Sequence, residues 1–292
     1  MQNRRDFLKQ SALLAAGTLV APAVLKGAPL TSSGKKNIGI QLYSLRDMVG
    51  KQGIQPVLEA VAKIGYTNLE TAGYNDGKIY GLDPADFRKR VADLGMKFTS
   101  AHLGQSYSKE KDQAVMDWWK KAIEAHSKAG ASYLVQASMP VNTKSRIEDL
   151  QLYCDYFTKV AGMAKASGLA FGFHNHTVEF QKIGDQVILD YMIAHTDPAS
   201  MIFELDVYWC QEGGANPVDY LKKYADRIRL THIKDEKEIG ASGKMDFKSI
   251  FKQMKANDIT DWYVEIEQYT HGDPVRSAEE SFRFLKEARF VY

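Results

Sequence analysis

Ionisable side chains stand at the ends of several apolar runs along the chain. His174 and His176 close the apolar start of LAFGFHNHTVE at 169–179, and three later runs end in a similar way. Those runs are IFELD at 202–206, LTHIKD at 230–235 and YVEIEQ at 263–268, and they carry Asp206, His232, Lys234 and Glu267. Imidazole and carboxylate groups without a thiolate suit Mn²⁺, Co²⁺, Zn²⁺ or Mg²⁺. Four such ends that converge would form one divalent metal site.

Strand-length apolar runs alternate with amphipathic stretches from Lys35 onward. We expect strands at 37–43, 67–71, 97–102, 132–137, 169–174, 201–207, 228–234 and 262–268. We expect helices at 52–64, 84–94, 109–129, 145–167, 186–195, 217–225, 247–256 and 275–289. Eight strand–helix units predict an α/β fold with parallel strands, a single (β/α)₈ TIM barrel. A doubly wound open sheet is the alternative, but no GxGxxG turn follows the first strand.

The polar residues at the strand ends are the candidate site residues, because TIM-barrel active sites lie at the C-terminal ends of the strands. Candidates for contact with a substrate are Gln41, Tyr43, Glu70, His102, Gln136, Trp209 and Lys234. Each also has an ordinary explanation. Glu70 could be an ion-pair partner inside the barrel, His102 a hydrogen-bonded loop residue, and Lys234 a partner of Asp235 or Glu70.

The first 30 residues have the pattern of an export signal. RRDFLK at 4–9 precedes an apolar run at 12–25 that contains Ala-Pro-Ala at 21–23. The basic hexapeptide resembles the twin-arginine signature, and the apolar run is short for a membrane span. We therefore expect a signal peptide at 1–30, a catalytic barrel at 36–292, and a periplasmic protein exported folded, with no stable membrane anchor after export.

Composition excludes some partners. The 292 residues carry a net charge of about +2 without a block of Lys and Arg, so nucleic acid is not expected as a partner. Cys154 and Cys210 are far apart in the sequence, and we expect both to be buried free thiols.

Six segments together resemble the sugar phosphate isomerase/epimerase family, the xylose-isomerase-like barrels. They are GIQLYSLRD at 39–47, SAHLG at 100–104, GFHNHTVEF at 172–180, ELDVYW at 204–209, THIKD at 231–235 and VEIEQ at 264–268. The resemblance spans residues 38–290 and implies one metal held by strands five to eight, through His174, Asp206, His232 and Glu267. The epimerase branch has a Glu on strand five, whereas this chain has His174 or His176 there.

The resemblance implies an enzyme that transfers a proton next to the carbonyl of a sugar or keto-sugar, through an enediolate that the metal stabilises. Glu267 or Glu179 would remove the proton, and His176 or Lys234 would return one or stabilise charge. The missing Glu also favours a hydratase or dehydratase, a lyase acting on a 3-keto-sugar or its enol derivative. The HNH-type segment at 174–176 resembles inosose-dehydratase-like proteins in this respect.

Other classes remain open at this stage. A non-catalytic periplasmic sugar-binding protein would use the same barrel mouth without chemistry. A DNA-repair barrel resembling AP endonucleases would need three zinc ions and a basic face. Members of the resembled family often form homodimers, so a homodimer is compatible with the sequence.

Overall fold

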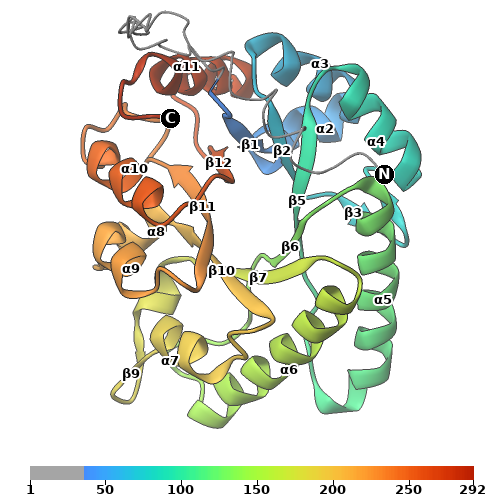
Figure 1. Ribbon diagram of the computed structural model, residues 1–292, viewed down its shortest axis with the longest axis vertical. Helices are drawn as coiled ribbons and strands as arrows, with labels where there is room; N and C mark the ends of the chain where they lie inside the picture. The colour runs from blue at the N-terminus through green and yellow to red at the C-terminus, as the bar shows by residue number, and fades with distance from the viewer. Residues whose placement is uncertain (1–35) are drawn as a thin grey trace, which may run out of the picture. The chain divides into compact units, whose positions relative to one another are not determined.

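Eight short strands pair in parallel and close on themselves (Figure 1). The computed structural model describes residues 36–292, so the predicted signal peptide at 1–30 lies outside the described residues. The barrel strands are β1 (Gly39–Gln41), β2 (Asn68–Thr71), β5 (Lys97–Leu103), β6 (Tyr133–Gln136), β7 (Ala170–His174), β10 (Met201–Asp206), β11 (Ile228–Lys234) and β12 (Trp262–Glu265). Pairing of β1 with β12 closes the ring, which confirms the predicted (β/α)₈ barrel.

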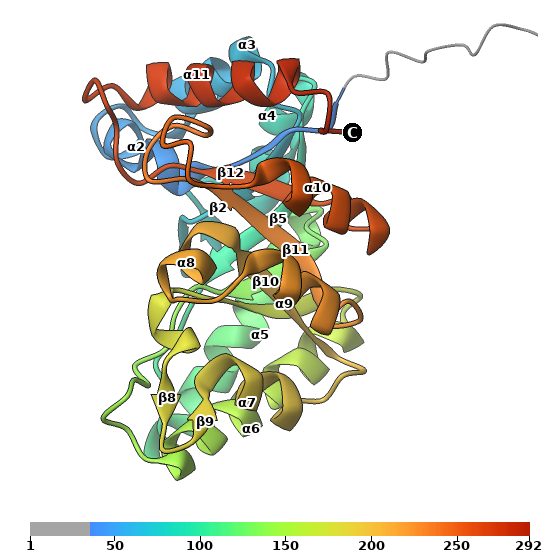
Figure 2. The ribbon, with the colours of Figure 1, turned by 90° about the vertical axis from the view of Figure 1, so that its left-hand side faces the viewer.

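Amphipathic helices cover the outside of the barrel. They are α2 (Arg46–Gln52), α3 (Ile54–Ile64), α4 (Pro84–Asp93), α5 (Asp112–Ala129), α6 (Ile147–Ala166), α7 (Ile188–His195), α8 (Val207–Glu212), α9 (Pro217–Lys223), α10 (Phe247–Ala256) and α11 (Pro274–Glu287). In α3, Ile54, Val57, Leu58 and Val61 are buried, which is the spacing of one helical face. Figure 2 shows α11 beside α3, where the last barrel unit meets the first.

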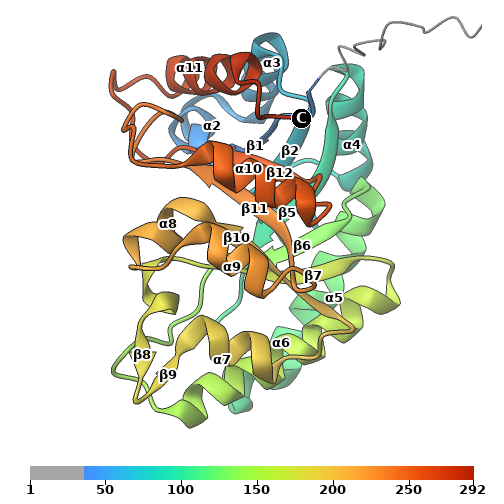
Figure 3. The same ribbon diagram turned by 60° about the vertical axis from the view of Figure 1, so that its left-hand side comes forward.

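Short elements that the periodicity does not predict lie in the connections. A hairpin of β3 (Tyr74–Asn75) and β4 (Lys78–Ile79) follows β2, and a hairpin of β8 (Lys182–Ile183) and β9 (Gln186–Val187) precedes α7. Figure 3 shows the second hairpin beside α7. Three 3₁₀ helices also occur in the connections: η1 (Leu42–Leu45), η2 (Lys109–Lys111) and η3 (Thr177–Phe180).

Two predicted strands end two or more residues earlier than expected. The first was expected to reach Tyr43, but the side chain of Gln41 accepts a hydrogen bond from the Tyr43 backbone N–H and starts η1. The eighth was expected to reach Gln268, but β12 ends at Glu265. Tyr43 and Glu267 therefore lie in the connections above the barrel.

The interior of the barrel changes from apolar to polar along the strands. Val135, Leu230 and Tyr263 form a small buried apolar cluster inside it. Further along, the register places Glu204 level with His174, Asp206 level with His232, and Lys234 level with Glu265. Because side chains alternate along a strand, these polar residues project inward together.

Both cysteines, Cys154 and Cys210, are buried free thiols, as predicted. Among the described residues, no helix combines the length and the apolar character that crossing a membrane requires.

Candidate active site

Four strand-end residues bring their ligand atoms together at the mouth of the barrel. His174 ends β7, Asp206 ends β10, His232 lies near the end of β11, and Glu265 ends β12. Their ligand atoms all lie within 4.8 Å of one another, and all four side chains are buried. We call these four residues the rim group.

Three atoms of the rim group have no hydrogen-bond partner among residues 36–292. They are Oδ2 of Asp206, Nδ1 of His232 and Oε2 of Glu265, and the last lies at ion-pair distance, 3.4 Å, from both Nδ1 of His232 and Nζ of Lys234. The other oxygen of Asp206 accepts from the backbone N–H of Trp209 at 2.8 Å, so Oδ2 is left for another partner. An unpaired buried polar group costs about 1–3 kcal/mol. A cation bound by these atoms would remove that cost, so the residues present fit a metal ion.

A second group lies one layer deeper and shares two histidines with the first. We call His102, His174, Glu204 and His232 the inner group; their ligand atoms also lie within 4.8 Å of one another. These atoms already pair with protein groups. The Nε2 atom of His102 lies 2.6 Å from Oε2 of Glu204, and Nε2 of His232 lies 2.5 Å from Oε2 of Glu70. The rim group is therefore the better site for a cation.

The carboxylates of the inner layer orient both shared histidines. Nδ1 of His174 lies 3.2 Å from Oε2 of Glu204, which leaves Nε2 of that ring for the rim. Nε2 of His232 faces Glu70, which leaves Nδ1 for the rim. Glu70 is itself fixed, because Ser100 Oγ donates to Oε1 at 2.5 Å and Gln41 Nε2 donates to Oε2 at 2.7 Å. Metal-binding histidines in proteins commonly have such a partner on the second ring nitrogen.

Charge in the inner layer is shared between carboxylates and imidazoles. Burial alone would raise the pKa of Glu70, but His102 and His232 hold it below its usual value. Burial alone would lower the pKa of His232, but three surrounding carboxylates hold it well above its usual value. Burial and the charge of Glu70 raise the pKa of Glu204 to about 7. These opposed shifts are those expected of buried groups that stabilise one another's charge.

The rim group is also electrostatically coupled. Burial raises the pKa of Asp206 to about 7. Burial would raise that of Glu265 as well, but Lys234 and His232 hold it well below its usual value. Nζ of Lys234 lies 3.4 Å from Oε2 of Glu265 and 3.2 Å from Oε1 of Glu267. A cation bound by the rim group would add positive charge beside Glu265, where Lys234 and His232 now supply it.

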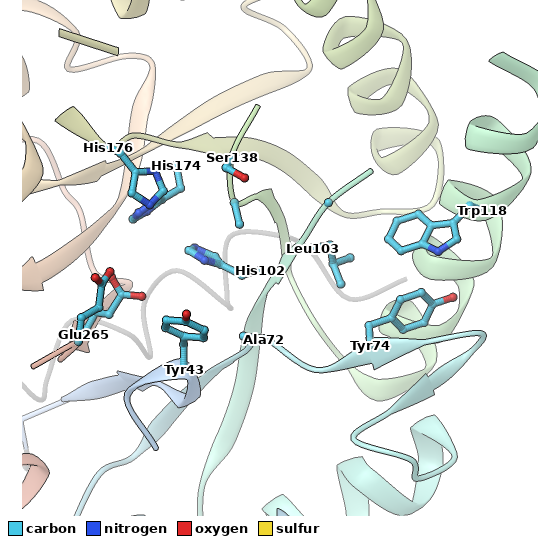
Figure 4. A pocket seen from close by; sticks show the side chains of 13 residues that line it. Tyr43, Ala72, Tyr74, His102, Leu103, Trp118, Ser138, His174, His176 and Glu265 are labelled. Carbon is cyan, nitrogen blue, oxygen red and sulfur yellow. The ribbon is translucent and has the colours of Figure 1, made fainter. Parts of the chain in front are cut away.

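A cavity of about 520 Å³ opens over the rim group (Figure 4). It is lined by Tyr43, Ala72, Tyr74, His102, Leu103, Gly104, Trp118, Ala137, Ser138, His174, His176, Glu265 and Glu267. The ionisable residues gather at one end and the aromatic pair Tyr74 and Trp118 at the other (Figure 4). The size is that of a small-molecule site, and its polar end can bind hydroxyl and carbonyl groups.

The structure places Glu265, rather than Glu267, with the other three predicted ligands. Glu267 lies two residues beyond the end of β12, belongs to neither group, and lines the cavity beside Lys234. Glu265 and Glu267 are two positions apart, so both would point to the same side of the strand expected at 262–268. The choice between them depended on where the strand ends, and β12 ends three residues earlier than expected.

The remaining predicted catalytic residues differ in their access to the cavity. His176 lines it, and burial lowers the pKa of its imidazole. Glu179 does not line it. Its Oε2 instead accepts from the backbone N–H of His176 at 2.7 Å, and burial raises the pKa of this carboxyl to about 7. Glu179 therefore fixes the loop that carries His176.

Of the residues predicted to contact a substrate, Tyr43 and His102 line the cavity. Tyr43 is 44% exposed, and the guanidinium of Arg46 stacks 4.5 Å from its ring centre. Gln41 and Glu70 lie below, in the inner layer. Gln136 lines a neighbouring cavity of about 340 Å³, and Nζ of Lys234 lies 5.4 Å from the ring centre of Trp209. Tyr74, Trp118 and Ser138 also line the cavity, but the sequence does not mark them as site residues because they stand in connections or on a helix and not at barrel-strand ends.

Known proteins are similar to this chain in fold and in sequence. A sugar phosphate isomerase/epimerase from Parabacteroides distasonis is 38% identical, with a TM-score of 0.82 over 88% of this chain and 100% of that chain. A second one from that organism is 32% identical, with a TM-score of 0.82 over 90% of this chain and 99% of its own. The inosose dehydratase of Geobacillus kaustophilus is 22% identical over 73% of this chain and 79% of its own length.

The matched region includes every residue of the rim and inner groups. Residues 58–288 match the family described as xylose isomerase-like TIM barrel. This chain therefore belongs to the xylose isomerase-like TIM barrel family.

Proposed function

We propose that this chain is a divalent-metal-dependent enzyme that transfers a proton next to the carbonyl of a sugar or keto-sugar. Relatives named as isomerase/epimerases and dehydratases make it an enzyme of the isomerase/epimerase or dehydratase kind. The observation that carries the metal dependence is the convergence of buried ligand atoms on Asp206, His232 and Glu265 that make no hydrogen bond within the described residues. His174 and Glu265 connect that set to the cavity, because both belong to the rim group and both line the cavity.

His174, Asp206, His232 and Glu265 would hold the ion. Their mixed nitrogen and oxygen donors suit Mn²⁺, Co²⁺ or Zn²⁺ better than Mg²⁺, which prefers oxygen ligands. A metal at this position supplies Lewis-acid polarisation of a bound carbonyl and so acidifies the neighbouring C–H.

The chain's own residues supply the proton transfer. Glu267 is the carboxylate that lines the cavity without belonging to the rim group, so it is placed to remove the proton. Lys234 remains an ammonium, because Glu265, Asp206 and Glu267 together outweigh burial and raise its pKa. It stabilises negative charge beside Glu267. Burial lowers the pKa of His176, so its imidazole is neutral at pH 7 and can accept a proton or a hydrogen bond at the same end of the cavity.

A second candidate is the loss or addition of water, a lyase reaction of a 3-keto-sugar or its enol derivative. Two-base epimerisation uses one carboxylate on each face of the carbon. Here the strand-five position is His174, and Glu179 faces the backbone of His176 instead of the cavity. Glu267 can remove the proton and then, as the carboxylic acid, return it to the leaving hydroxyl, while the neutral imidazole of His176 can hydrogen-bond that hydroxyl. The curated inosose dehydratases favour the same candidate.

Both candidates begin with the same proton removal, and one experiment separates them. The Mn²⁺-loaded chain is incubated with a panel of keto-sugars and cyclic keto-polyols in D₂O and followed by proton NMR. We expect metal-dependent loss of the signal next to the carbonyl, with an isomeric product for an isomerase and a dehydrated product for a lyase. Exchange that persists after EDTA treatment would refute the metal-dependent mechanism. Binding of sugar without any exchange would favour a non-catalytic binding protein.

We also propose that the enzyme works in the periplasm. The support is RRDFLK at 4–9, followed by the apolar run at 12–25.

A further inference from the structure

The cavity has a second end that proton transfer at the rim group does not use. Tyr74 and Trp118 line this end, with their ring centres 5.2 Å apart and their planes at 86°. Figure 4 shows them on the opposite side of the cavity from His174, His176 and Glu265, with His102 and Leu103 between. Both aromatic side chains are only half-buried, so part of each ring faces the cavity.

Trp118 is held in place by its neighbour on α5. Trp119 is fully buried, and its Nε1 donates to the hydroxyl of Tyr156 at 2.6 Å. Adjacent positions on a helix point about 100° apart. Trp119 therefore anchors this turn of α5 in the core while Trp118 lines the cavity, and the two rings contact each other edge to face with centres 5.0 Å apart.

Tyr74 is fixed by the β3–β4 hairpin. Its hydroxyl accepts from the backbone N–H of Gly77 at 3.0 Å. Its ring centre lies 5.1 Å from that of the buried His126. The hairpin is attached to the end of β2 through Tyr80, whose hydroxyl accepts from the Ala72 N–H at 2.9 Å and whose N–H donates to the Gly73 carbonyl at 2.7 Å. A side chain at Gly73 would collide with the Tyr80 ring, since an added Cβ would lie 2.2 Å from it.

The aromatic end is thus preformed and connected to the polar end. The cavity volume of about 520 Å³ lies within the range of about 300–1,000 Å³ that drug-sized ligands occupy. A single sugar ring over the rim group fills only part of it. Ala72 and Leu103 line the space between the two ends with small or apolar side chains (Figure 4). Exposed aromatic rings at a fixed angle are typical of sites that bind the face of another ring.

We propose that the substrate carries a second ring joined to its sugar, and that this ring packs on Trp118 and Tyr74. The ligand class is therefore a glycoside whose substituent is a ring, either an aromatic ring or a second sugar. The placement of the first sugar at the polar end rests on the proposed function. The aromatic contact does not, because neither Trp118 nor Tyr74 belongs to the rim group.

Binding of three probes to the full chain tests this proposal. The probes are methyl β-D-glucopyranoside, phenyl β-D-glucopyranoside and cellobiose, measured by titration calorimetry and saturation-transfer NMR. We expect at least one of the two ring-bearing probes to bind about tenfold more tightly than the methyl glucoside, which corresponds to about 1.4 kcal/mol. The phenyl and cellobiose arms distinguish an aromatic ring from a second sugar. Equal affinities for all three, or no binding of either ring-bearing probe, would overturn the proposal.

Substitutions in the cavity test which residues cause the tighter binding of the ring-bearing probes. Trp118→Leu and Tyr74→Leu should abolish the tenfold preference and leave methyl glucoside binding unchanged, and Ala72→Leu should weaken the ring-bearing probes by narrowing the passage. Tyr191→Leu, which removes a half-buried aromatic residue of α7 that does not line the cavity, is the matched control and should keep the preference. A preference that survives in both Trp118→Leu and Tyr74→Leu would contradict the assignment.

The metal-free chain separates this proposal from the proposed function. The preference for a ring-bearing probe should persist after EDTA treatment. If the chain shows this preference but catalyses no deuterium exchange, only the proposal that it is an enzyme is refuted. Metal-dependent exchange in a chain without the preference would refute the aromatic subsite alone.

Discussion

The Nε2 atom of His232 lies 2.5 Å from Oε2 of Glu70, one layer below the mouth of the barrel. The other nitrogen of the same ring, Nδ1, is one of the three unpartnered atoms of the rim group. One imidazole therefore joins the inner carboxylates to the proposed metal site. Glu70 fixes the orientation of that imidazole, and the charges of Glu204 and Glu70 help to hold its pKa well above the usual value.

Replacing Glu70 by Gln should weaken metal binding about 10–100-fold, because a neutral amide keeps a hydrogen-bond acceptor but removes the negative charge behind His232. Titration calorimetry with Mn²⁺ measures the change, and thermal unfolding followed by circular dichroism shows that the variant is folded. Glu59→Gln, on the exposed face of α3, is the matched control. An affinity in Glu70→Gln equal to that of the unchanged chain would remove the proposed role of Glu70.

Glu265→Gln should lose bound metal, whereas Glu267→Gln should keep it and lose proton transfer. The reason is that the Glu265 carboxylate lies within 4.8 Å of the other rim ligands, while Glu267 lies beyond the strand and pairs with Lys234. Metal content by atomic emission and deuterium exchange by NMR give the two readouts. If Glu267→Gln loses the metal and Glu265→Gln retains it, Glu267 is the ligand, as the sequence alone predicted.

The strand ends could be recognised from the sequence because a buried strand needs apolar residues, whereas a catalytic or metal site needs ionisable ones. Apolar runs that end in histidines and carboxylates indicated strand ends facing a polar cavity, and the structure brings the ligand atoms of three predicted residues, His174, Asp206 and His232, within 4.8 Å of one another. The choice between Glu265 and Glu267 needed the position at which β12 stops pairing. That position is set by contacts with other segments, such as the bond from the Ile266 N–H to Ser44 Oγ at 2.9 Å.

The aromatic end of the cavity could not be predicted in this way. Trp118 stands on α5 between Asp117 and Trp119 and has the pattern of an ordinary amphipathic helix, and Tyr74 lies on a two-residue strand. Residues 44 positions apart meet there only because the β3–β4 hairpin folds back toward α5. Glu204 is a similar case. It lies two positions before Asp206 on β10, and its hydrogen bond with His102 joins strands whose residues are 102 positions apart.

Metal affinity should rise as the pH increases up to and through about 7. His232 must lose a proton before Nδ1 can donate to a metal, and the surrounding carboxylates hold its pKa well above the usual value. Asp206, with a pKa of about 7, must lose a proton as well. Binding one ion therefore displaces protons, and the affinity increases up to about tenfold per pH unit for each proton released. Calorimetry in two buffers of different ionisation enthalpy counts them. An affinity that stays constant from pH 5 to 8 would contradict this coupling.

Export should depend on the arginine pair at the start of the chain. Replacing Arg4 and Arg5 by Lys keeps the positive charge of the segment but removes the twin-arginine signature. We expect the double variant to stay in the cytoplasmic fraction, while the unchanged chain reaches the periplasm with its metal bound. Arg46→Lys, outside the signal, is the control for fractionation. Equal periplasmic amounts of both chains would show that another route exports the protein.

Glu179 should make the folded state less stable as pH rises. Burial raises its pKa from 4.5 to about 7, so between these values the folded chain keeps a proton that the unfolded chain has lost. Ionisation therefore favours the unfolded state, and stability attributable to Glu179 falls by up to about 3 kcal/mol from pH 4.5 to 7. Glu179→Gln keeps an oxygen that can accept from the His176 N–H and cannot ionise. Urea unfolding of both chains in EDTA at pH 5, 6, 7 and 8 should show the variant gaining stability relative to the unchanged chain as pH rises. Glu287→Gln, at the exposed end of α11, controls for the change of charge. A constant difference between Glu179→Gln and the unchanged chain across that range would mean that Glu179 is ionised in the folded protein and that the loop carrying His176 is held by a charged cap.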